Sequence, residues 1–352
     1  MKTLLIKINP PGLDRKKIQL AADIIKRGGL VAFPTETVYG LGADALNTNA
    51  VLRLFEAKKR PFDNPPIVHL ADPEAIYPLV RHVSQKAKQL MEQFWPGPLT
   101  LIFKHSNMVP KQTVTNLDTI AIRIPNHPIT RALLKQANCP IAAPSANLSG
   151  KPSPTTAQHV LEDLDGYIDA LIDGGATEIG VESTVVDLSV DPPVLLRPGG
   201  TPYEALKTVL DDLKLHPFVQ TEVELSLKKT ASPGMKHKHY APKAPVILVE
   251  GPQEAVTTKI LTLTTTFKQT GHKVAVLATD ETQKAYQADI VKSMGSRFNL
   301  VIVAQNLFRL LREVDAPGVD VILAEGVSTE GLGLAIMNRL RKAAGYHIIK
   351  AN

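Results

Sequence analysis

Residues 30–42 read LVAFPTETVYGLG, where a short apolar run closes at a proline and passes into a turn rich in threonine and glycine. Such a run is typical of a buried strand that stops pairing at the proline. Residues 49–61 follow with apolar side chains at helical spacing, and residues 15–28 upstream show the same spacing before a glycine pair. The sequence therefore predicts helix, strand, glycine turn and helix at the start of an α/β domain.

The rest of the chain divides by its pattern of apolar runs. Short runs interrupted by prolines continue to about residue 200 and predict an irregular mixed sheet. Beyond residue 244, runs such as VILVEG and VDVILAEG alternate with helical segments, as in a parallel sheet covered by helices. We therefore expect a mixed α/β domain over 1–205, a linker over 206–243, and a smaller three-layer α/β domain over 244–352.

The charge balance disfavours a protein that coats nucleic acid. The 352 residues hold 40 Lys plus Arg and 34 Asp plus Glu, a formal net charge of +6, and residues 1–205 hold 21 basic and 20 acidic side chains. A dedicated nucleic-acid binder would carry a larger local excess, because its affinity comes mainly from neutralised phosphates. The distribution favours a small anionic ligand.

The single cysteine, Cys139, excludes a disulfide framework and an all-cysteine zinc site. No apolar run is long enough to cross a membrane, and the N-terminal apolar stretch is broken by a lysine and prolines. We expect a soluble cytoplasmic protein without membrane association.

Two common nucleotide motifs are not supported. Residues 40–45, GLGADA, match G-x-G-x-x-A, but no suitably placed acidic residue follows about twenty positions on, so a dinucleotide fingerprint is disfavoured. No G-x-x-x-x-G-K-[ST] occurs, which excludes a P-loop. A nucleotide site would have to be built differently.

Polar side chains instead gather at predicted strand ends. Residues 34–42 crowd two threonines, a carboxylate and a tyrosine, which suits a small polar ligand, although a turn with a core tyrosine explains the same residues. Lys58 and Arg60 end a helix, with Asn64 and His69 shortly after. A solvated helix cap is the alternative here, but the convergence of cations, amide and imidazole suits phosphate oxygens and a carboxylate.

Further candidates follow along the chain. In DTIAIRIP at 118–125, Thr119 and Arg123 share one face of an alternating strand. The hydroxyl-rich loop PSANLSG is followed by Ser153, predicted to cap the next helix, and a helix N-terminus is also an anion site. GVESTV at 180–185 and LLRPG at 195–199 add polar residues that turn chemistry explains equally well.

These segments, in this order, resemble the Sua5/YrdC/YwlC family in its longer, two-domain Sua5 form. The matching stretches are PTETVYGLG, KKRP with NPPIVH, WPGPLT, DTIAIRIP, PIAAPSANLSGKPSPT, GVESTVVD, LLRPG, SPGMKHKHYAP and GLAIMNRLRKAA. The resemblance covers nearly the whole chain and implies a YrdC-like domain with a twisted sheet, the linker, and a Rossmann-like C-terminal domain.

The resemblance implies a nucleotidyltransferase, an L-threonylcarbamoyladenylate synthase. Such enzymes join L-threonine, bicarbonate and ATP into L-threonylcarbamoyl-AMP and release pyrophosphate. The product feeds a separate threonylcarbamoyl transferase complex, which forms N6-threonylcarbamoyladenosine beside the anticodon of ANN-decoding tRNAs. Magnesium is expected on the triphosphate, bound by phosphate oxygens and water and not by a dedicated protein site.

The resemblance also implies two groups of binding residues. L-threonine is expected at Thr37, His69, Arg123, Ala143 and Ser183. ATP is expected at Lys58, Arg60, Asn64, Thr119, Ser145, Ser153, Arg197 and Tyr240. No protein nucleophile is expected, and Lys58 and Arg60 would position the phosphates.

In Sua5-type proteins the segment that matches residues 232–242 folds over the catalytic cleft, which implies that Tyr240 closes on the nucleotide. His237 and His239 could instead form a metal pair, but no third ligand is near in sequence. The C-terminal domain shows no obvious site, and the resemblance suggests regulation or association for it.

Two other functions compete with adenylate synthesis for a domain of this kind. An RNA-binding module of YrdC-like fold, with weak direct contact to tRNA, is the alternative, although the near-neutral first domain favours a small ligand. Carbamoyl transfer in hydrogenase maturation uses a related module, but it needs cysteine-rich zinc fingers that one cysteine cannot supply.

Overall fold

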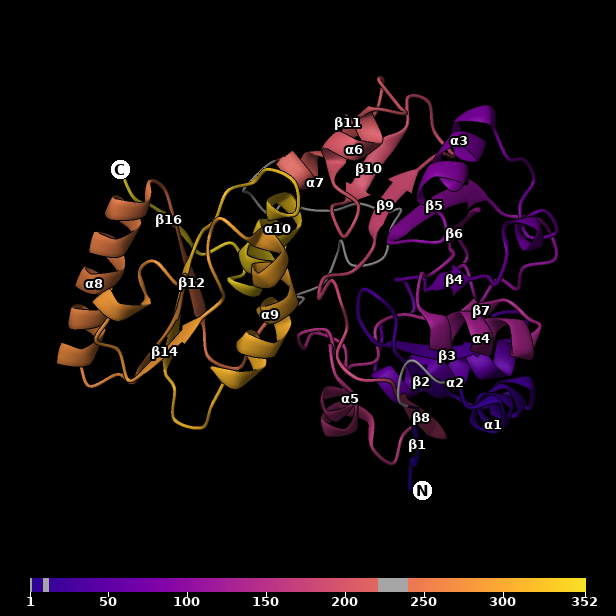
Figure 1. Cartoon of the computed structure of the whole chain (residues 1–352), viewed down its shortest axis with the longest axis horizontal. Helices are drawn as coiled ribbons and strands as arrows, with labels where there is room; N and C mark the ends of the chain where they lie inside the picture. Colours follow the sequence, from indigo (N-terminus) through magenta and orange to yellow (C-terminus); the bar gives the residue numbers. More distant parts are fainter. Residues whose placement is uncertain (1, 9–12, 221–239) are drawn as a thin grey trace. The chain divides into compact units, whose positions relative to one another are not determined.

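The structure is a computed structural model that describes residues 2–8, 13–220 and 240–352. These residues fold into two compact units (Figure 1). The first comprises residues up to 149 and 153–220, and the second comprises 150–152 and 240–352. The two predicted domains are therefore both present, and each is described by itself below.

The first unit is built on one mixed sheet, whose strand order is β1-β8-β2-β3-β7-β4-β6-β5-β9-β10-β11. Pairing is parallel for β1 with β8 and for β4 with β6, and antiparallel for β2 with β3 and for β5 with β6. The strands are β1 (Leu4–Lys7), β2 (Val31–Phe33), β3 (Gly40–Asp44), β4 (Ile67–His69), β5 (Leu99–Lys104), β6 (Thr119–Arg123), β7 (Ile141–Ala142), β8 (Ala170–Asp173), β9 (Thr184–Asp187), β10 (Val194–Arg197) and β11 (Lys214–Leu215). The expectation of an irregular mixed sheet is confirmed.

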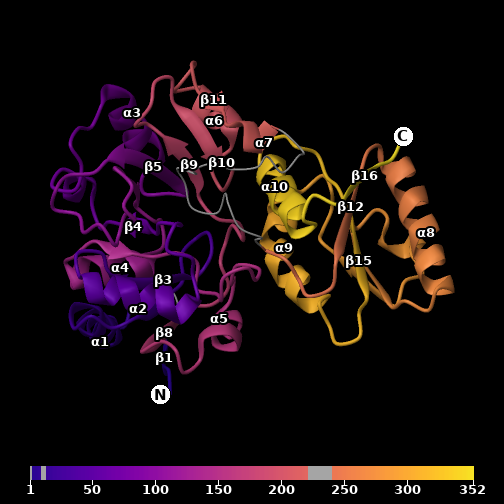
Figure 2. The same cartoon turned by 180° about the vertical axis from the view of Figure 1, so that it is seen from behind.

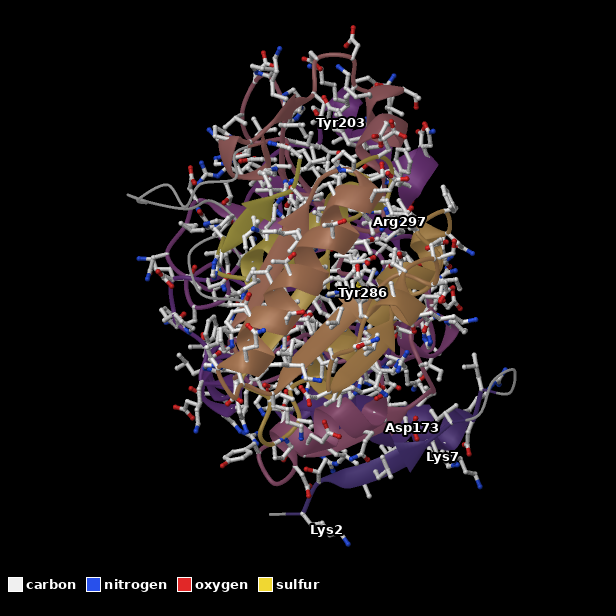
Figure 3. All side chains as sticks on the ribbon, turned by 90° about the vertical axis from the view of Figure 1, so that its left-hand side faces the viewer. Lys2, Lys7, Asp173, Tyr203, Tyr286 and Arg297 are labelled. Atoms are coloured by element: carbon white, nitrogen blue, oxygen red, sulfur yellow. The ribbon has the colours of Figure 1, made fainter. Side chains whose placement is uncertain are left out.

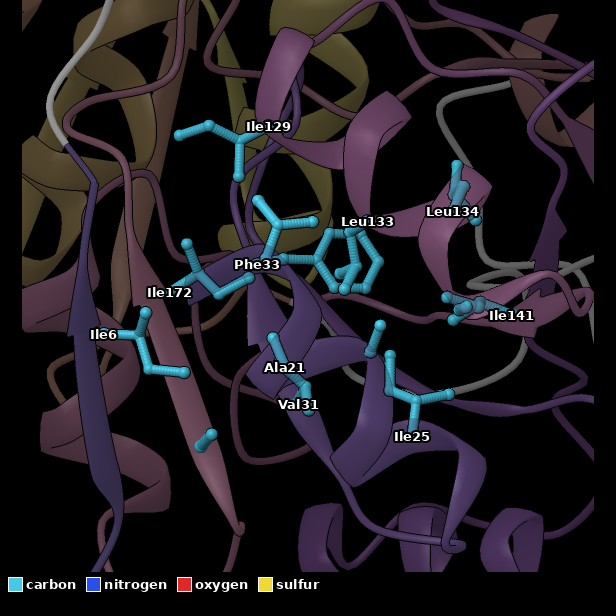
Figure 4. Close-up of a cluster of buried hydrophobic side chains, with 14 of the residues drawn as sticks. Ile6, Ala21, Ile25, Val31, Phe33, Ile129, Leu133, Leu134, Ile141 and Ile172 are labelled. Carbon is cyan, nitrogen blue, oxygen red and sulfur yellow. The ribbon is translucent and has the colours of Figure 1, made fainter. Parts of the chain in front are cut away.

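Helices α1 and α4 cover part of this sheet and enclose its main apolar core. Ile25 of α1 and Leu133 of α4 lie with Phe33 of β2 and Ile172 of β8 in one buried cluster (Figure 4). The helices of the unit are α1 (Arg15–Lys26), α2 (Thr48–Lys58), α3 (Gln85–Phe94), α4 (Pro128–Ala137), α5 (Ala157–Leu164), α6 (Tyr203–Lys207), α7 (Pro217–Gln220) and the 3-10 turn η1 (Pro73–Ile76). Apolar side chains at helical spacing produce this core, as the pattern of residues 15–28 predicts.

Residues 206–220, predicted to open the linker, lie inside the first unit. Leu206 is fully buried, and β11 pairs in parallel with β10. The physical reason is that a five-residue helix and a two-residue strand are too short for periodicity to show whether they belong to the domain or to a linker, although their apolar side chains pack in the domain.

The cap of α5 also differs from the prediction, because the helix begins later than Ser153. The N-cap is Thr156, whose side chain accepts a hydrogen bond from the backbone N–H of His159 at 3.3 Å. Ser153 is buried and its hydroxyl donates to Glu182 at 2.7 Å, so it is committed to a long-range contact and cannot cap the helix.

We expect Thr156→Ala to lower the free energy of unfolding by about 1 kcal/mol, because an N–H of the first turn loses its acceptor. Urea denaturation monitored by circular dichroism measures this. Thr156→Ser, which keeps the hydroxyl, is the control and should stay close to the native value. Equal losses in both variants would contradict the capping assignment.

The second unit is a three-layer α/β unit, which confirms the expectation. Its sheet is fully parallel in the order β14-β13-β15-β12-β16. Helix α8 covers one face, and α9 and α10 cover the other (Figures 1 and 2). The elements are β12 (Val246–Glu250), α8 (Gln253–Gln269), β13 (Val274–Ala278), the 3-10 turn η2 (Gln283–Ala285), β14 (Ile290–Ser293), α9 (Leu300–Glu313), β15 (Val321–Glu325), α10 (Gly333–Ala343) and β16 (Ile348–Lys350).

Within the described part of the chain, no helix combines the length and apolar character needed to cross a membrane.

Candidate functional site

Neighbouring strands of the first sheet align several predicted site residues in one row. His69 at the end of β4 is paired with Arg123 at the end of β6, and Arg123 is paired with Thr100 of β5. Ser183 directly precedes β9, and its hydroxyl lies 2.8 Å from that of Thr100. Paired residues of adjacent strands project from the same face, so these side chains form one polar surface.

Arg123 is the centre of this row and is only 3% exposed. Its Nη1 donates to the hydroxyl of Thr37 at 2.9 Å, and its Nε donates to the carbonyl of Gly97 at 3.1 Å. Its Nη2 lies 2.7 Å from Oε1 of Glu36. The guanidinium is thereby fixed in one orientation, as a site that recognises a carboxylate by geometry requires.

Glu36 is a buried acid that our sequence-based site assignment did not include. Its Oε1 also accepts the backbone N–H of Asn126 at 3.0 Å, whereas its Oε2 has no hydrogen-bond partner among the described residues. A buried carboxylate is retained only when a cation compensates it, and Arg123 does so here. The signal in the sequence was an acid between two threonines at a strand end, which turn chemistry explains equally well.

Ser183 is buried at the edge of the same row, where Arg197 of β10 holds it. Nε and Nη2 of Arg197 donate to the carbonyl of Ser183 at 3.1 and 2.9 Å, and Nη2 lies 3.1 Å from its hydroxyl. The structure thus brings together Ser183, which was predicted to bind L-threonine, and Arg197, which was predicted to bind ATP. Ala143, which was also predicted to bind L-threonine, is buried, and its N–H donates to the carbonyl of Ile67 at 2.8 Å. Of its backbone polar groups, only the carbonyl could therefore face a ligand.

His69 is a neutral imidazole at physiological pH. Burial, with the nearby charge of Arg123 as a second cause, lowers its pKa to about 3. Its Nδ1 lies 3.3 Å from the carbonyl of Ile67, and its ring meets Phe33 edge to face. The side chain can therefore exchange hydrogen bonds with a ligand without adding charge.

This depressed pKa has a consequence for stability. An unfolded histidine binds a proton below about pH 6.5, while folded His69 resists protonation, so its contribution to stability is complete above that pH and declines as pH falls from about 6.5 towards 3. We expect His69→Gln to flatten this acid limb of the unfolding free energy, measured by urea denaturation across that range. The exposed His82 gives the matched variant His82→Gln, and equal flattening by both would contradict the assignment.

Lys58 lies under the loop that supplies Ser145 and is 1% exposed. Its ammonium donates to the carbonyls of Ser145 and Asn147. Burial, followed by the charge of Arg60, moves its pKa well below the ordinary lysine value. The sequence predicted a phosphate-facing cation here, and the structure shows a cation that holds the hydroxyl-rich loop.

Arg60 holds the loop that follows it, because its Nε donates to the carbonyl of Asn64 at 2.7 Å and its Nη2 to that of Pro65 at 3.1 Å. Asn64 itself is buried. Thr119 begins β6 on the face of Arg123, about 13 Å away along the strand. Between them lies an apolar cluster that includes Ala121. Buried apolar side chains on the same face of the sheet thus separate Thr119 from the row around Arg123.

The glycines at 40–42 lie inside a strand, where Gly42 has a packing role. Residues 40–44 form strand β3 itself, with no phosphate-binding turn. A Cβ at Gly42 would lie 2.6 Å from the ring of Phe33. Tyr39 is a core residue whose hydroxyl donates to the carbonyl of Gly175 at 2.6 Å, and burial raises its pKa.

Tyr240 belongs to the second unit, where it is buried with a backbone φ of 63°. Its ring centroid lies 5.1 Å from that of Phe308, and the guanidinium of Arg339 lies 5.7 Å from it. The preceding residues 232–239, with the predicted closing segment and the histidine pair, lie outside the described residues. Closure on a nucleotide stays a prediction.

Two family models match the chain, one over most of each unit. Residues 23–199 match the Sua5/YciO/YrdC family model, described as telomere recombination, and residues 201–345 match the C-terminal domain model of threonylcarbamoyl-AMP synthase. The chain is 52% identical to a threonylcarbamoyl-AMP synthase of Pyrococcus abyssi, covering 99% of each chain, and 49% identical to one of Bacillus subtilis, covering 95% and 94%.

A solved structure shows the same fold. The crystal structure of P. abyssi Sua5 complexed with L-threonine superposes with a TM-score of 0.95 at 51% identity, and covers 99% of this chain and 100% of that one. The match therefore extends over both units. The chain therefore belongs to the Sua5 family of threonylcarbamoyl-AMP synthases, in its two-domain form.

Proposed function

We propose that the protein condenses L-threonine, bicarbonate and ATP into L-threonylcarbamoyl-AMP, pyrophosphate and water. The observation that carries this proposal is the fixed, buried guanidinium of Arg123 in a row with His69 and Ser183. The relative's complex with L-threonine supports an amino acid as the ligand of this row.

The row fits L-threonine group by group. Arg123 would bind the α-carboxylate, since a guanidinium pairs with it through two parallel hydrogen bonds. Thr37, neutral His69, Ser183 and the carbonyl of Ala143 would supply uncharged partners for the amine and hydroxyl. The unpartnered oxygen of Glu36 adds negative potential beside Arg123, which favours a ligand that carries both charges.

The remaining predicted residues would hold ATP. Lys58 and Arg60 fix the loops that present Ser145 and Asn64, and Thr119, Ser153 and Arg197 complete the set. We keep Tyr240 in this set, as the resemblance implies. Magnesium would enter with ATP on phosphate oxygens and water.

The chemistry needs positioning more than a protein nucleophile. The threonine amine adds carbon dioxide derived from bicarbonate, and a carbamate oxygen then attacks the α-phosphorus of ATP while the bond to pyrophosphate breaks. The chain's part is to hold the two anionic reactants in line and to stabilise their charge with Arg60, Arg123 and Arg197. Buried surroundings also protect the labile mixed anhydride from water.

We further propose that the product passes in the cytoplasm to a threonylcarbamoyl transferase that modifies ANN-decoding tRNAs. A free adenylate is a small activated acyl donor, so its acceptor must be supplied by a second enzyme. Direct contact of this chain with tRNA would be weak, because the first domain has almost no net charge.

The test is pyrophosphate release with each substrate omitted in turn. Release should require ATP, L-threonine and bicarbonate together, and the nucleotide product should carry the threonylcarbamoyl group by mass spectrometry. Turnover that is indifferent to both threonine and bicarbonate would overturn the proposal. Tight RNA binding without turnover would favour the RNA-binding alternative.

A further inference from the structure

The second unit contains a cavity of about 340 Å³ that the proposed reaction does not use. This volume falls in the range of about 300–1,000 Å³ typical of small-molecule sites. The walls come from the ends of β12 and β15 with the loops that follow them, from the loop after β14, and from α10. The lining residues are Glu250, Gly251, Arg297, Phe298, Gly326, Val327, Ser328, Thr329 and Met337.

The cavity lies where ligands bind in doubly wound sheets. Strands β12 and β15 are parallel neighbours, and both end at this cavity. The chain leaves β12 for α8 on one face of the sheet and leaves β15 for α10 on the other (Figures 1 and 2). Loops that diverge in this way open a crevice at the carboxyl ends of the two strands, which is the usual ligand site of such folds.

Close backbone packing fixes the walls of this crevice. A Cβ at Gly251, whose φ is +148°, would overlap the carbonyl oxygen of Ala351. A Cβ at Gly333 would overlap the carbonyl oxygen of Ser328 in the same way. Both loops are therefore held against their neighbours by glycines, and the cavity is formed before any ligand arrives.

Two hydrogen-bond donors at the cavity are available to a ligand, because one has only a weak acceptor and the other has a nitrogen without a hydrogen bond in the described part of the chain. The N–H of Val327 donates to Sδ of Met337 at 3.2 Å, and a thioether is a weak acceptor. Arg297, labelled in Figure 3, uses Nε and Nη2 on Thr279 and Glu325, while its Nη1 makes no hydrogen bond within the described residues. The exposed hydroxyl residues Ser328 and Thr329 adjoin them.

The one carboxylate that lines the cavity is already neutralised. Glu250 accepts hydrogen bonds from Nε and Nη2 of Arg341 at 2.8 and 2.9 Å and from Nζ of Lys350 at 2.8 Å. Two cations therefore offset this acid, which would otherwise repel an anion. Arg297 is itself paired with Glu325 at 3.2 Å and lies 4.0 Å from Glu281, so the charges around the cavity balance. An anionic group would therefore be held by direct hydrogen bonds from the free Nη1 of Arg297 and from the N–H of Val327.

Phe298 adds an apolar surface at the same place. Its side chain lines the cavity yet is 86% exposed, which is unusual for a phenylalanine of a folded domain.

We propose that the crevice between β12 and β15 binds a small organic phosphate, with the phosphate at Arg297 and Val327 and a planar ring on Phe298. This inference does not depend on the reaction of the first unit.

The test uses the full chain with AMP as the probe and Met337 as a local reporter. Methionine methyl groups labelled with ¹³C give separate NMR signals, and Met337→Leu identifies that of Met337. We expect its signal to shift saturably with AMP, because a phosphate that takes the N–H of Val327 frees the thioether. Adenosine and ribose 5-phosphate, which each lack one half of the ligand, should bind at least about tenfold more weakly.

Variants locate the site independently of AMP binding in the first unit. Phe298→Ala should raise, by about tenfold, the AMP concentration at which the Met337 signal has completed half of its shift, because one stacking contact is lost. Val301→Ala, an exposed apolar residue outside the cavity lining, is the matched control and should not change it. Arg297→Lys keeps a charge beside Glu325 and should also weaken binding. A Met337 signal that does not move at millimolar AMP, or that moves equally in all three variants, would overturn the proposal.

Discussion

Arg123→Ala is expected to lower threonine-dependent pyrophosphate release by about a thousandfold, because the carboxylate of threonine loses its paired guanidinium. The same change leaves Glu36 buried without its cation, which should lower the free energy of unfolding by about 3–5 kcal/mol. Initial rates at saturating ATP and varied threonine measure the first effect, and urea denaturation measures the second.

The double variant Arg123→Ala with Glu36→Gln separates these two effects. Removing the uncompensated charge should restore much of the stability, since the buried pair is then neutral on both sides. Threonine use should stay lost, because the guanidinium is still absent. Recovery of threonine-dependent activity together with stability would show that Arg123 acts only as a structural partner of Glu36.

Lys58→Met is expected to lower kcat/KM for ATP by about tenfold to a hundredfold, since hydrogen bonds to a charged group contribute about 1.5–3 kcal/mol. The carbonyls of Ser145 and Asn147 would lose their donor, and the loop that carries Ser145 would lose its anchor. We expect a loss of about 2–4 kcal/mol in unfolding free energy as well. Steady-state kinetics with varied ATP and denaturation measure both quantities.

The neighbouring lysine supplies the control. Lys59→Met removes the same charge one residue away, at an exposed position that ends α2. Its kinetics and stability should stay close to those of the native protein. If both variants lost ATP use equally, the general positive charge of this helix end would be responsible, and the anchoring role of Lys58 would be contradicted.

Much of the fold could be predicted because local patterns agree with the tertiary structure. Apolar residues at helical spacing in 15–28 do pack as α1 over β2, and the alternating segment 118–125 does form β6. The parallel sheet of the second unit followed from buried runs separated by helices. In each case the signal lies within a few turns or one strand, where periodicity is informative.

The parts that could not be predicted depend on contacts between distant residues. Ser153 was expected to cap α5, but its partner Glu182 lies 29 residues later, and no local pattern indicates that bond. The buried pair of Glu36 with Arg123 and the anchoring of a loop by Lys58 join segments more than 80 residues apart. Residue type alone indicated chemistry at these positions but not the partner of each group.

Because β1 and β2 both pair with β8, part of the first sheet can form only after β8 has been synthesised. Lys7 and Asp173, both labelled in Figure 3, are paired residues, so the first strand waits for a segment made more than 160 residues later. Until then β1 has no neighbour and β2 keeps one open edge during synthesis on the ribosome. An unfinished chain therefore exposes the apolar face of α1 and two unpaired strand edges, where chaperones would bind and where premature association would begin.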